Sequence, residues 1–341
     1  MKSKANIWIG CISVVALSIL ILDAPTAIKG AQDGISLCIN VIVPSLFPFF
    51  VISVVLNSIL AGTQWNFLHP IGKLCGIPVG GESLLMLGLL GGYPVGAQCI
   101  NDAYHSKIIN KNTAQRMLGF CNNAGPAFIF GMLGSVFSTK VAPWCVWGTH
   151  ILSAVIVGLI LPFKENNSCA IGGMQVRSLS SAIEIAIKNL GKVCGWVILF
   201  RVFIVFCQRW FMWLLPTAWQ CVIAGILELS NGCLGLASIP NEGLRYILAT
   251  AFINFGGLCV AMQTKSVTEH IGTGMYFPGK LLQTCISIIL AWITQSLVFP
   301  PENRISVPWW ICFLLIIPCI YPYLQKAKKV VAIPRFMVYN K

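Results

Sequence analysis

The chain has 341 residues, of which 57% are hydrophobic and 10% are charged. A soluble domain carries about 25% charged residues, so this composition excludes a water-soluble globular protein, and it equally excludes collagen-like, disordered and disulfide-scaffold chains. One crossing of the hydrocarbon core needs about 20 apolar residues, which leaves room for about eight to ten membrane segments. The sequence therefore predicts an all-α polytopic membrane protein.

The net charge is +13, but the basic residues are scattered between apolar runs and form no basic face interleaved with aromatic residues. We therefore expect no nucleic-acid partner. Basic residues hold cytoplasmic ends in place. The chain opens with Met1-Lys2-Ser3-Lys4, and its tail carries Lys326, Lys328, Lys329, Arg335 and Lys341, so both ends are expected in the cytoplasm.

The first segments define an N-terminal transmembrane helix over residues 1–24. Ile7 to Leu22 is apolar, and because no small-x-small cleavage site follows, a retained helix is favoured over a signal peptide. A first repeat is expected over residues 25–163. It opens with an amphipathic helix over 25–43 and a spanning helix from Pro44 to Ala61.

Two interrupted apolar runs follow. The first is broken after Leu90 at Gly91, Gly92, Tyr93 and Pro94, and the second after Cys121 at Asn122, Asn123, Gly125 and Pro126. A polar connection over 101–112 separates the two runs, and Val141 to Pro162 is a spanning helix. Residues 164–177 are polar and are predicted to link two halves.

The same order recurs in a second repeat over residues 178–300. It comprises an amphipathic segment (178–192), a spanning helix (193–213), two short apolar helices (220–229 and 244–253) and a spanning helix (281–299). The short helices end at Glu228-Leu229-Ser230-Asn231 and at Asn254-Phe255-Gly256-Gly257. Residues 301–341 are expected to hold a last transmembrane helix over 309–324 and a basic tail.

This order predicts two inverted repeats with interrupted helices. Gly88 to Gly91 aligns with Gly225 to Glu228, and Phe120 to Gly125 aligns with Phe252 to Gly257. Few identities support either alignment, so chance similarity stays an alternative explanation. The four breaks nevertheless fall at corresponding places in the two halves.

Breaks of this kind indicate function. Non-helical backbone at membrane depth is tolerated only where protein buries it or where it lines a watery cavity, and breaks at corresponding points of two repeats point to a transporter's binding site. Proline suits the first turn of a helix, so Pro94 and Pro126 are expected to restart helices. Their free N–H groups would favour an anion.

Polar and charged side chains at this depth are further candidates. Asn122, Asn123, Asn231 and Asn254 either line a cavity or join helices to one another. Glu228 lies in an otherwise uncharged stretch, so it is either functional or hydrogen-bonded to amides at the break. Arg201 either pairs with Glu228, meets an anionic substrate or reaches the interface.

The sequence gives no support for a metal site, a cofactor or an enzymatic activity. The 15 cysteines form no CxxC, and the four histidines are far apart, so we expect reduced cysteines that act as small hydrophobes, no metal and no cofactor. The chain contains no GxxxxGK[ST], GxSxG or HExxH motif, so an enzyme is not expected.

Several motifs resemble those of the YlbJ family of sporulation integral membrane proteins, also called SpoVV. They are Pro44-Ser45-Leu46-Phe47-Pro48-Phe49-Phe50, Gly91-Gly92-Tyr93-Pro94-Val95-Gly96-Ala97, Phe120-Cys121-Asn122-Asn123-Ala124-Gly125-Pro126, Gly225-Ile226-Leu227-Glu228, and Phe255-Gly256-Gly257 with Gln263. That family belongs with the nucleoside-recognition or "gate" domain proteins and is similar to concentrative nucleoside transporters. One departure is Gly91, where the family pattern would place a serine.

The resemblance implies transport of dipicolinic acid, a flat aromatic dianion, across the outer forespore membrane of a sporulating bacterium. The candidate substrate-binding residues are Gly91, Gly92, Tyr93, Pro94, Asn122, Asn123, Gly125, Pro126, Arg201, Glu228, Ser230, Asn231, Asn254, Gly256, Gly257 and Gln263. The expected partners are a small anionic substrate, the lipid bilayer and a coupling ion whose identity stays open. The alternatives are a nucleoside or other metabolite carrier and a non-transporting scaffold for spore maturation.

Overall fold

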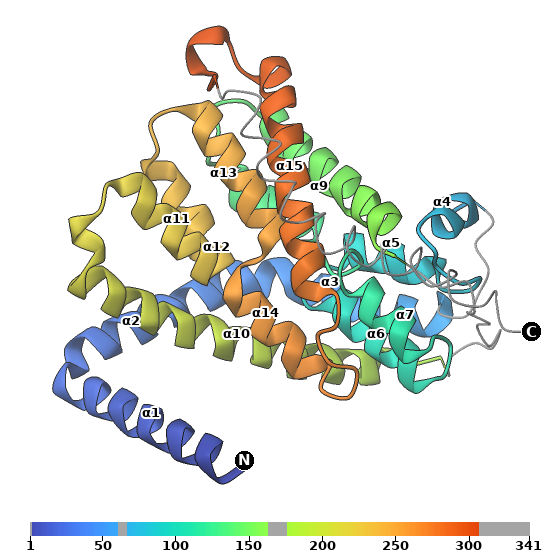
Figure 1. The fold of residues 1–341 in the computed structure, drawn as a ribbon, viewed down its shortest axis with the longest axis horizontal. Coiled ribbons are helices and arrows are strands. Elements are labelled where there is room, and N and C mark those ends of the chain that lie inside the picture. Colours follow the sequence, from blue (N-terminus) through green and yellow to red (C-terminus); the bar gives the residue numbers. More distant parts are fainter. Residues whose placement is uncertain (1, 61–66, 163–175, 307–341) are drawn as a thin grey trace, which may run out of the picture.

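The computed structural model describes residues 2–60, 67–162 and 176–306, and every regular element in these ranges is a helix (Figure 1). The predicted all-α fold is therefore confirmed. The proposed last helix over 309–324, the basic tail and all but two residues of the proposed linker lie outside the described residues.

The N-terminal helix α1 (Lys2–Leu22) lies at one edge of the molecule and meets α2 at its C-terminal end (Figure 1), and its side chains from Asn6 onward are largely exposed. The two segments predicted next are in fact one continuous helix. It consists of α2 (Ala24–Leu37), a π-helical turn (Cys38–Ile42) and α3 (Val43–Leu60). Pro44 does not start a new helix, because the π-helical turn before it accommodates the missing N–H. The Ser45 hydroxyl donates to the Val41 carbonyl over 2.7 Å, which satisfies a backbone acceptor there.

The second half opens in the same way. The amphipathic and spanning segments predicted over 178–192 and 193–213 form the single helix α10 (Leu179–Trp210), capped by the Ser178 side chain. Helix α10 packs along both α2 and α3, so the two long helices of the halves lie against each other.

Short helices follow each long helix. In the first half they are α4 (His69–Leu74), α5 (Glu82–Leu90), α6 (Val95–His105), α7 (Lys111–Met117) and α8 (Pro126–Leu133), before α9 (Val141–Ile160). In the second half they are α11 (Thr217–Leu227), α12 (Leu229–Gly235), α13 (Glu242–Phe255) and α14 (Gly257–Val267), before α15 (Tyr276–Val298). Short 3-10 turns cover Met212–Leu214, Leu236–Ser238 and Pro301–Asn303.

The four breaks are found where the sequence predicts them, between α5 and α6, α7 and α8, α11 and α12, and α13 and α14. The polar connection is shorter than expected, since α6 continues to His105. Both halves thus have the order long helix, two interrupted pairs and spanning helix, and α9 packs against α15.

Two glycines have matching positions in the two halves. A Cβ on Gly88 would lie 1.7 Å from the Cys121 carbonyl oxygen, and a Cβ on Gly225 would lie 2.5 Å from the Phe252 ring. Each glycine lets the first interrupted pair pack on the second. Gly88 and Gly225 are also the residues that the sequence alignment matches. The inversion of one repeat relative to the other stays a prediction.

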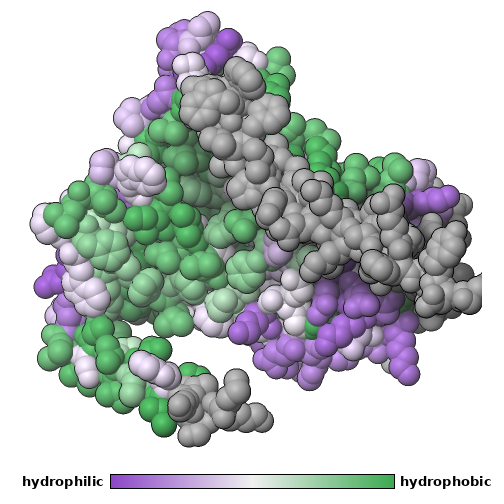
Figure 2. All heavy atoms as spheres, viewed as in Figure 1, coloured by the Kyte–Doolittle hydropathy of each residue, from purple (hydrophilic) through white to green (hydrophobic). Residues whose placement is uncertain are grey.

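Within the part of the chain that the structure describes, five helical stretches are long and apolar enough to cross a membrane. They are Ala24–Leu60, Val141–Ile160, Leu179–Trp210, Glu242–Val267 and Tyr276–Val298. Apolar side chains cover much of the face seen in Figure 2, and hydrophilic residues gather beyond α13 and α15 and around α6 and α7. Large exposed apolar patches of this kind indicate contact with lipid or a partner. The expected total of eight to ten membrane segments stays a prediction, because that total also counts half-helices, which are too short to cross a membrane individually.

Candidate functional site

The two breaks of the first half lie against each other. Gly92 has φ +79°, a left-handed conformation that glycine adopts without strain. A Cβ on Gly125 would lie 3.0 Å from the Gly92 Cα. Gly125 caps α8, and Pro126 is the first residue of that helix, as predicted. Pro94 immediately precedes α6, so it also restarts a helix.

The two breaks of the second half are joined in a similar way. Gly257, with φ +80°, lies so close that a Cβ there would be 3.4 Å from the Glu228 Cα. The Glu228 carboxylate caps α12 and accepts hydrogen bonds from the Ser230 and Asn231 amides, over 3.0 and 2.8 Å. These amides are therefore taken by Glu228, and the start of α12 has fewer donors for an anion than the sequence suggested.

Tyr93 joins the breaks of the two halves. Its hydroxyl donates to the Ile253 carbonyl over 3.3 Å, and its ring lies against Gly256, where an added Cβ would be 3.2 Å from the ring. Asn122 makes a second connection. It accepts from the Ala97 amide over 3.1 Å and donates to the Thr264 hydroxyl over 2.9 Å. All four breaks thus meet in one buried region.

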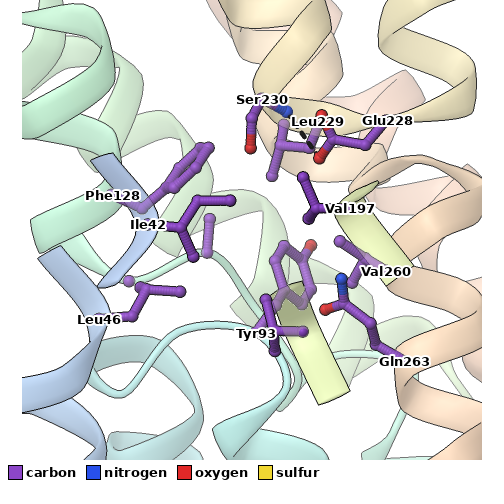
Figure 3. Close-up of a pocket in the computed structure, with 13 residues that line it drawn as sticks. Ile42, Leu46, Tyr93, Phe128, Val197, Glu228, Leu229, Ser230, Val260 and Gln263 are labelled. Carbon is purple, nitrogen blue, oxygen red and sulfur yellow. Dashed lines mark hydrogen bonds between the residues drawn. The ribbon is translucent and has the colours of Figure 1, made fainter. Parts of the chain in front are cut away.

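A small cavity of about 30 Å³ lies in this region (Figure 3). Tyr93 and Gln263 are at one end, and Glu228 and Ser230 are at the other. Its apolar walls come from Ile42, Leu46, Phe128, Val193, Val197, Leu229 and Val260, with Ala124 and Gly125. A volume of this size holds about two water molecules. We call this conformation, in which the cavity is too small for an aromatic ligand, the closed state of the site.

A buried lysine lies next to the cavity, and the sequence analysis missed it. Lys280 is 1% exposed, and its Nζ donates to Asn123 Oδ1 over 2.9 Å and to Gln283 Oε1 over 2.7 Å. The same Nζ lies 5.3 Å from the centre of the Tyr93 ring. Predicting the helix from Leu281 placed Lys280 outside it, whereas α15 begins at Tyr276.

A polar stripe could have revealed this lysine. Lys280, Gln283 and Ser287 are spaced as i, i+3 and i+7, which places them on one face of a helix, and all three are buried. Gly279 brings this face to the break between α7 and α8, since a Cβ there would lie 2.5 Å from the Gly119 Cα.

An open polar cleft of about 600 Å³ lies on the other side of Glu228. Arg201 and Asn231 line this cleft rather than the closed cavity. Arg201 pairs with Asp33 over 2.8 Å and donates to Asn231 Oδ1 over 2.9 Å. The Asn231 side-chain amide in turn donates to Glu228 over 2.6 Å. Arg201 therefore reaches Glu228 only through Asn231, and its ion-pair partner is Asp33.

The other predicted site residues differ in their position relative to the cavity. Tyr93, Gly125, Glu228, Ser230 and Gln263 line the cavity. Gly92, Asn123, Gly256 and Gly257 lie next to its walls, while Gly91, Pro94 and Pro126 shape the breaks. The Asn254 side chain points away, accepting from His150 and Ser153 of α9 over 2.8 and 2.9 Å.

These features define a class of protein. Spanning helices surround interrupted helices that meet at a buried polar centre, where Glu228 lines a small cavity and bonds to Asn231, which lines an open cleft. The chain is a multi-pass membrane protein whose polar centre lies among its helices.

Comparison with known proteins gives one relative. The chain is 23% identical to the sporulation integral membrane protein YlbJ of Bacillus subtilis (strain 168), and the match covers 85% of this chain and 84% of that protein. The match supports membership of the YlbJ family, as the motifs around the breaks indicated. No family model matches the chain. No solved structure matches it either.

Proposed function

We propose that the protein is a membrane transporter of a small anionic aromatic metabolite. The observation that carries this proposal is the meeting of four helix breaks, two from each half, around one small cavity. Tyr93 reaches the cavity from the first half, and Glu228, Ser230 and Gln263 reach it from the second. Interrupted helices at corresponding points of two repeats are typical of secondary transporters, whose substrate lies between the repeats.

The charge near the cavity favours an anion. Lys280 is a buried lysine whose Nζ lies 5.3 Å from the centre of the Tyr93 ring, and among the described residues no carboxylate forms an ion pair with it. A charge at this depth is costly and marks a substrate or ion pathway by default. The N-termini of α8 and α14 also lack a side-chain cap, and uncapped N–H groups favour negative charge.

Dipicolinate is the substrate that we favour. The resemblance of the breaks to the YlbJ family implies it, and the relative's name refers to sporulation. Its flat aromatic ring suits the apolar walls and the Tyr93 ring, and its carboxylates suit Lys280. The corresponding place of action is the outer forespore membrane of a sporulating cell.

The open cleft gives the substrate a route toward the cavity. The cleft ends at Asn231, and the cavity begins at Glu228 and Ser230. The contacts from Asp33 through Arg201 and Asn231 to Glu228 join the lining of the cleft to the lining of the cavity. Alternating access then requires these contacts to rearrange as the cavity expands.

Flux into proteoliposomes tests the proposal. Purified full-length protein should carry labelled dipicolinate across the bilayer faster than protein-free vesicles, and it should carry labelled uridine much more slowly. Faster uridine flux would contradict the anionic substrate and favour a nucleoside carrier. Flux of neither compound above that of empty vesicles, from folded protein, would contradict transport and favour a scaffold.

A further inference from the structure

Two donors share a single oxygen atom beside the cavity. Lys280 Nζ and Gln283 Nε2 both donate to Asn123 Oδ1, over 2.9 and 3.0 Å. Asn123, Lys280 and Gln283 are each at most 1% exposed. The Asn123 oxygen is itself held in place, because its own amide nitrogen donates to the Phe120 carbonyl over 2.6 Å.

No carboxylate among the described residues is bonded to Lys280 in this arrangement. Its partners are two neutral amide oxygens and the face of the Tyr93 ring. Hydrogen bonds between an ammonium and a carboxylate are roughly twice as strong as those between neutral groups. A carboxylate oxygen in place of Asn123 Oδ1 would therefore satisfy both donors better than the amide does.

Tyr93 is the side chain that the cavity and the lysine share. It lines the cavity, which Lys280 does not, and Lys280 Nζ lies 5.3 Å from its ring centre. The ring is held by packing against Gly256 and by a long hydrogen bond of 3.3 Å to Ile253. It occupies the short connection between α5 and α6, whose Gly92 has a left-handed backbone.

We propose that Lys280 and Gln283 form a receptor for one carboxylate group of the substrate. In the closed state Asn123 Oδ1 occupies the place of the carboxylate oxygen. Displacement of the Tyr93 ring joins the receptor to the cavity, which is otherwise too small for any aromatic ligand. This inference rests on the proposed function and adds to it a recognition site that requires one carboxylate.

The ligand chemistry follows from this geometry. Pyridine-2-carboxylate, which keeps one carboxylate, should compete with dipicolinate for the site. Pyridine-2,6-dicarboxamide has nearly the same shape without the charge, and it should not compete. Uridine serves as a neutral ligand that does not need the receptor.

Removal of the lysine charge is the first test. We expect Lys280→Met to lower dipicolinate flux and dipicolinate affinity at least tenfold, because a buried ammonium that pairs with the substrate is lost. Affinity is read from ligand-dependent thermal stabilisation of the purified full-length protein. Lys265→Met is the matched control, since Lys265 is exposed on the neighbouring helix α14, and it should behave as the wild type does.

Asn123→Asp is the second test, and it does not depend on a loss of packing. The variant places a permanent carboxylate between the same two donors. The second carboxylate oxygen replaces the amide nitrogen that donates to the Phe120 carbonyl, so the variant should fold with a somewhat lower unfolding temperature and bind dipicolinate at least tenfold more weakly. A folded Asn123→Asp protein with wild-type affinity would overturn the receptor.

The outcomes separate this inference from the proposed function. Wild-type flux of dipicolinate that survives both substitutions would overturn the receptor and leave transport intact. Absence of wild-type flux would overturn transport, and the stabilisation assay with pyridine-2-carboxylate would still test the receptor by itself. Equal competition by the dicarboxamide would also overturn the receptor.

Discussion

At the scale of single residues, Glu228 has the structural role that the sequence offered as one alternative, and its functional role stays a prediction. Its carboxylate caps α12 through the Ser230 and Asn231 amides and accepts a third bond from the Asn231 side chain. It also lines the cavity. A side chain that closes a helix break is held in a fixed position, and it thereby presents fixed polar atoms to the cavity.

Glu228→Gln should weaken both roles. Glutamine keeps one acceptor oxygen, but its NH₂ group faces donors from Asn231. An unsatisfied buried donor costs about 1–3 kcal/mol, so we expect a lower unfolding temperature in detergent, normal insertion into the membrane and strongly reduced dipicolinate flux. Glu242→Gln is the control, because Glu242 bonds to Ser138 at the start of α13, away from the cavity. Wild-type flux in Glu228→Gln would leave Glu228 with a structural role alone.

The sequence identified some of these residues and missed others for physical reasons. Asn122, Asn123 and Glu228 stand out because polar residues are rare within apolar runs. The sequence does not give the rotation of each helix about its axis. It therefore could not show that Asn254, which borders a break, turns toward His150 on α9. Lys280 was overlooked because it stands near a helix start, where a lysine commonly reaches the interface.

At the scale of elements, the glycines at the breaks allow close packing of backbones. Gly256 has φ +78°, and a Cβ there would lie 3.2 Å from the Tyr93 ring. Its neighbour Gly257 packs in the same way on Glu228. The sequence analysis placed these glycines among the candidate substrate-binding residues, whereas in the closed state each faces another break.

Gly256→Ala should therefore destabilise the protein. A non-glycine residue in this conformation costs about 1–3 kcal/mol, and the new methyl group also displaces Tyr93. We expect a lower unfolding temperature and weaker dipicolinate binding. Gly131→Ala in α8 is the control, since a Cβ there meets nothing within 4 Å, and it should be neutral or stabilise the helix by up to about 1 kcal/mol. Equal unfolding temperatures for the two variants would contradict this account of the break.

The contact between α2 and α10 gives a second prediction at this scale. Arg201 joins Asp33 on α2 to Asn231 on α12. Arg201→Met leaves Asp33 unpaired, and we expect a loss of about 1 kcal/mol or less, since the Asp33 and Arg201 side chains are 37% and 22% exposed. The double variant Asp33→Asn with Arg201→Met should recover part of that loss. Strictly additive unfolding free energies would show that the pair is not coupled.

Helix breaks were predictable, but the continuity of the long helices was not. A cluster of Gly, Pro or Asn residues within an apolar run marks each of the four breaks. The change from moderately apolar to strongly apolar sequence near Pro44 looks similar, yet the helix continues through it by a π-helical turn. Tertiary packing of α10 along this helix favours continuity, and that contact joins segments far apart in the sequence.

At the scale of the whole molecule, the two halves share one order of elements. Each contributes a long helix, two interrupted pairs and a spanning helix, and the long helices and spanning helices pack pairwise across the molecule. The sequence predicted this order from the positions of four breaks. It could not predict the closed cavity, because cavity size depends on side-chain packing between segments far apart in the chain.

Inverted repeats make a prediction about loops that occupy equivalent places in the two halves. The loop between α6 and α7 (residues 106–110) joins the interrupted pairs of the first half, and residues 236–241 join those of the second. If the halves are inverted, these loops lie on opposite sides of the membrane. The first loop contains Lys107 and is followed by Lys111, while the second contains no Lys or Arg. The first is therefore expected in the cytoplasm.

Epitope insertion can measure this arrangement. A tag inserted after Lys107 should bind antibody only after the cells are permeabilised, whereas a tag inserted after Ser238 should bind antibody on intact spheroplasts. Dipicolinate flux of each tagged protein in proteoliposomes checks that the insertion has preserved the fold. Hydrophilic residues gather around α6 and α7 and, separately, beyond α13 and α15 (Figure 2), which gives the molecule two polar ends. Two tags exposed on the same side would mean that the repeats are parallel, and the binding site would then not lie on an axis within the membrane plane.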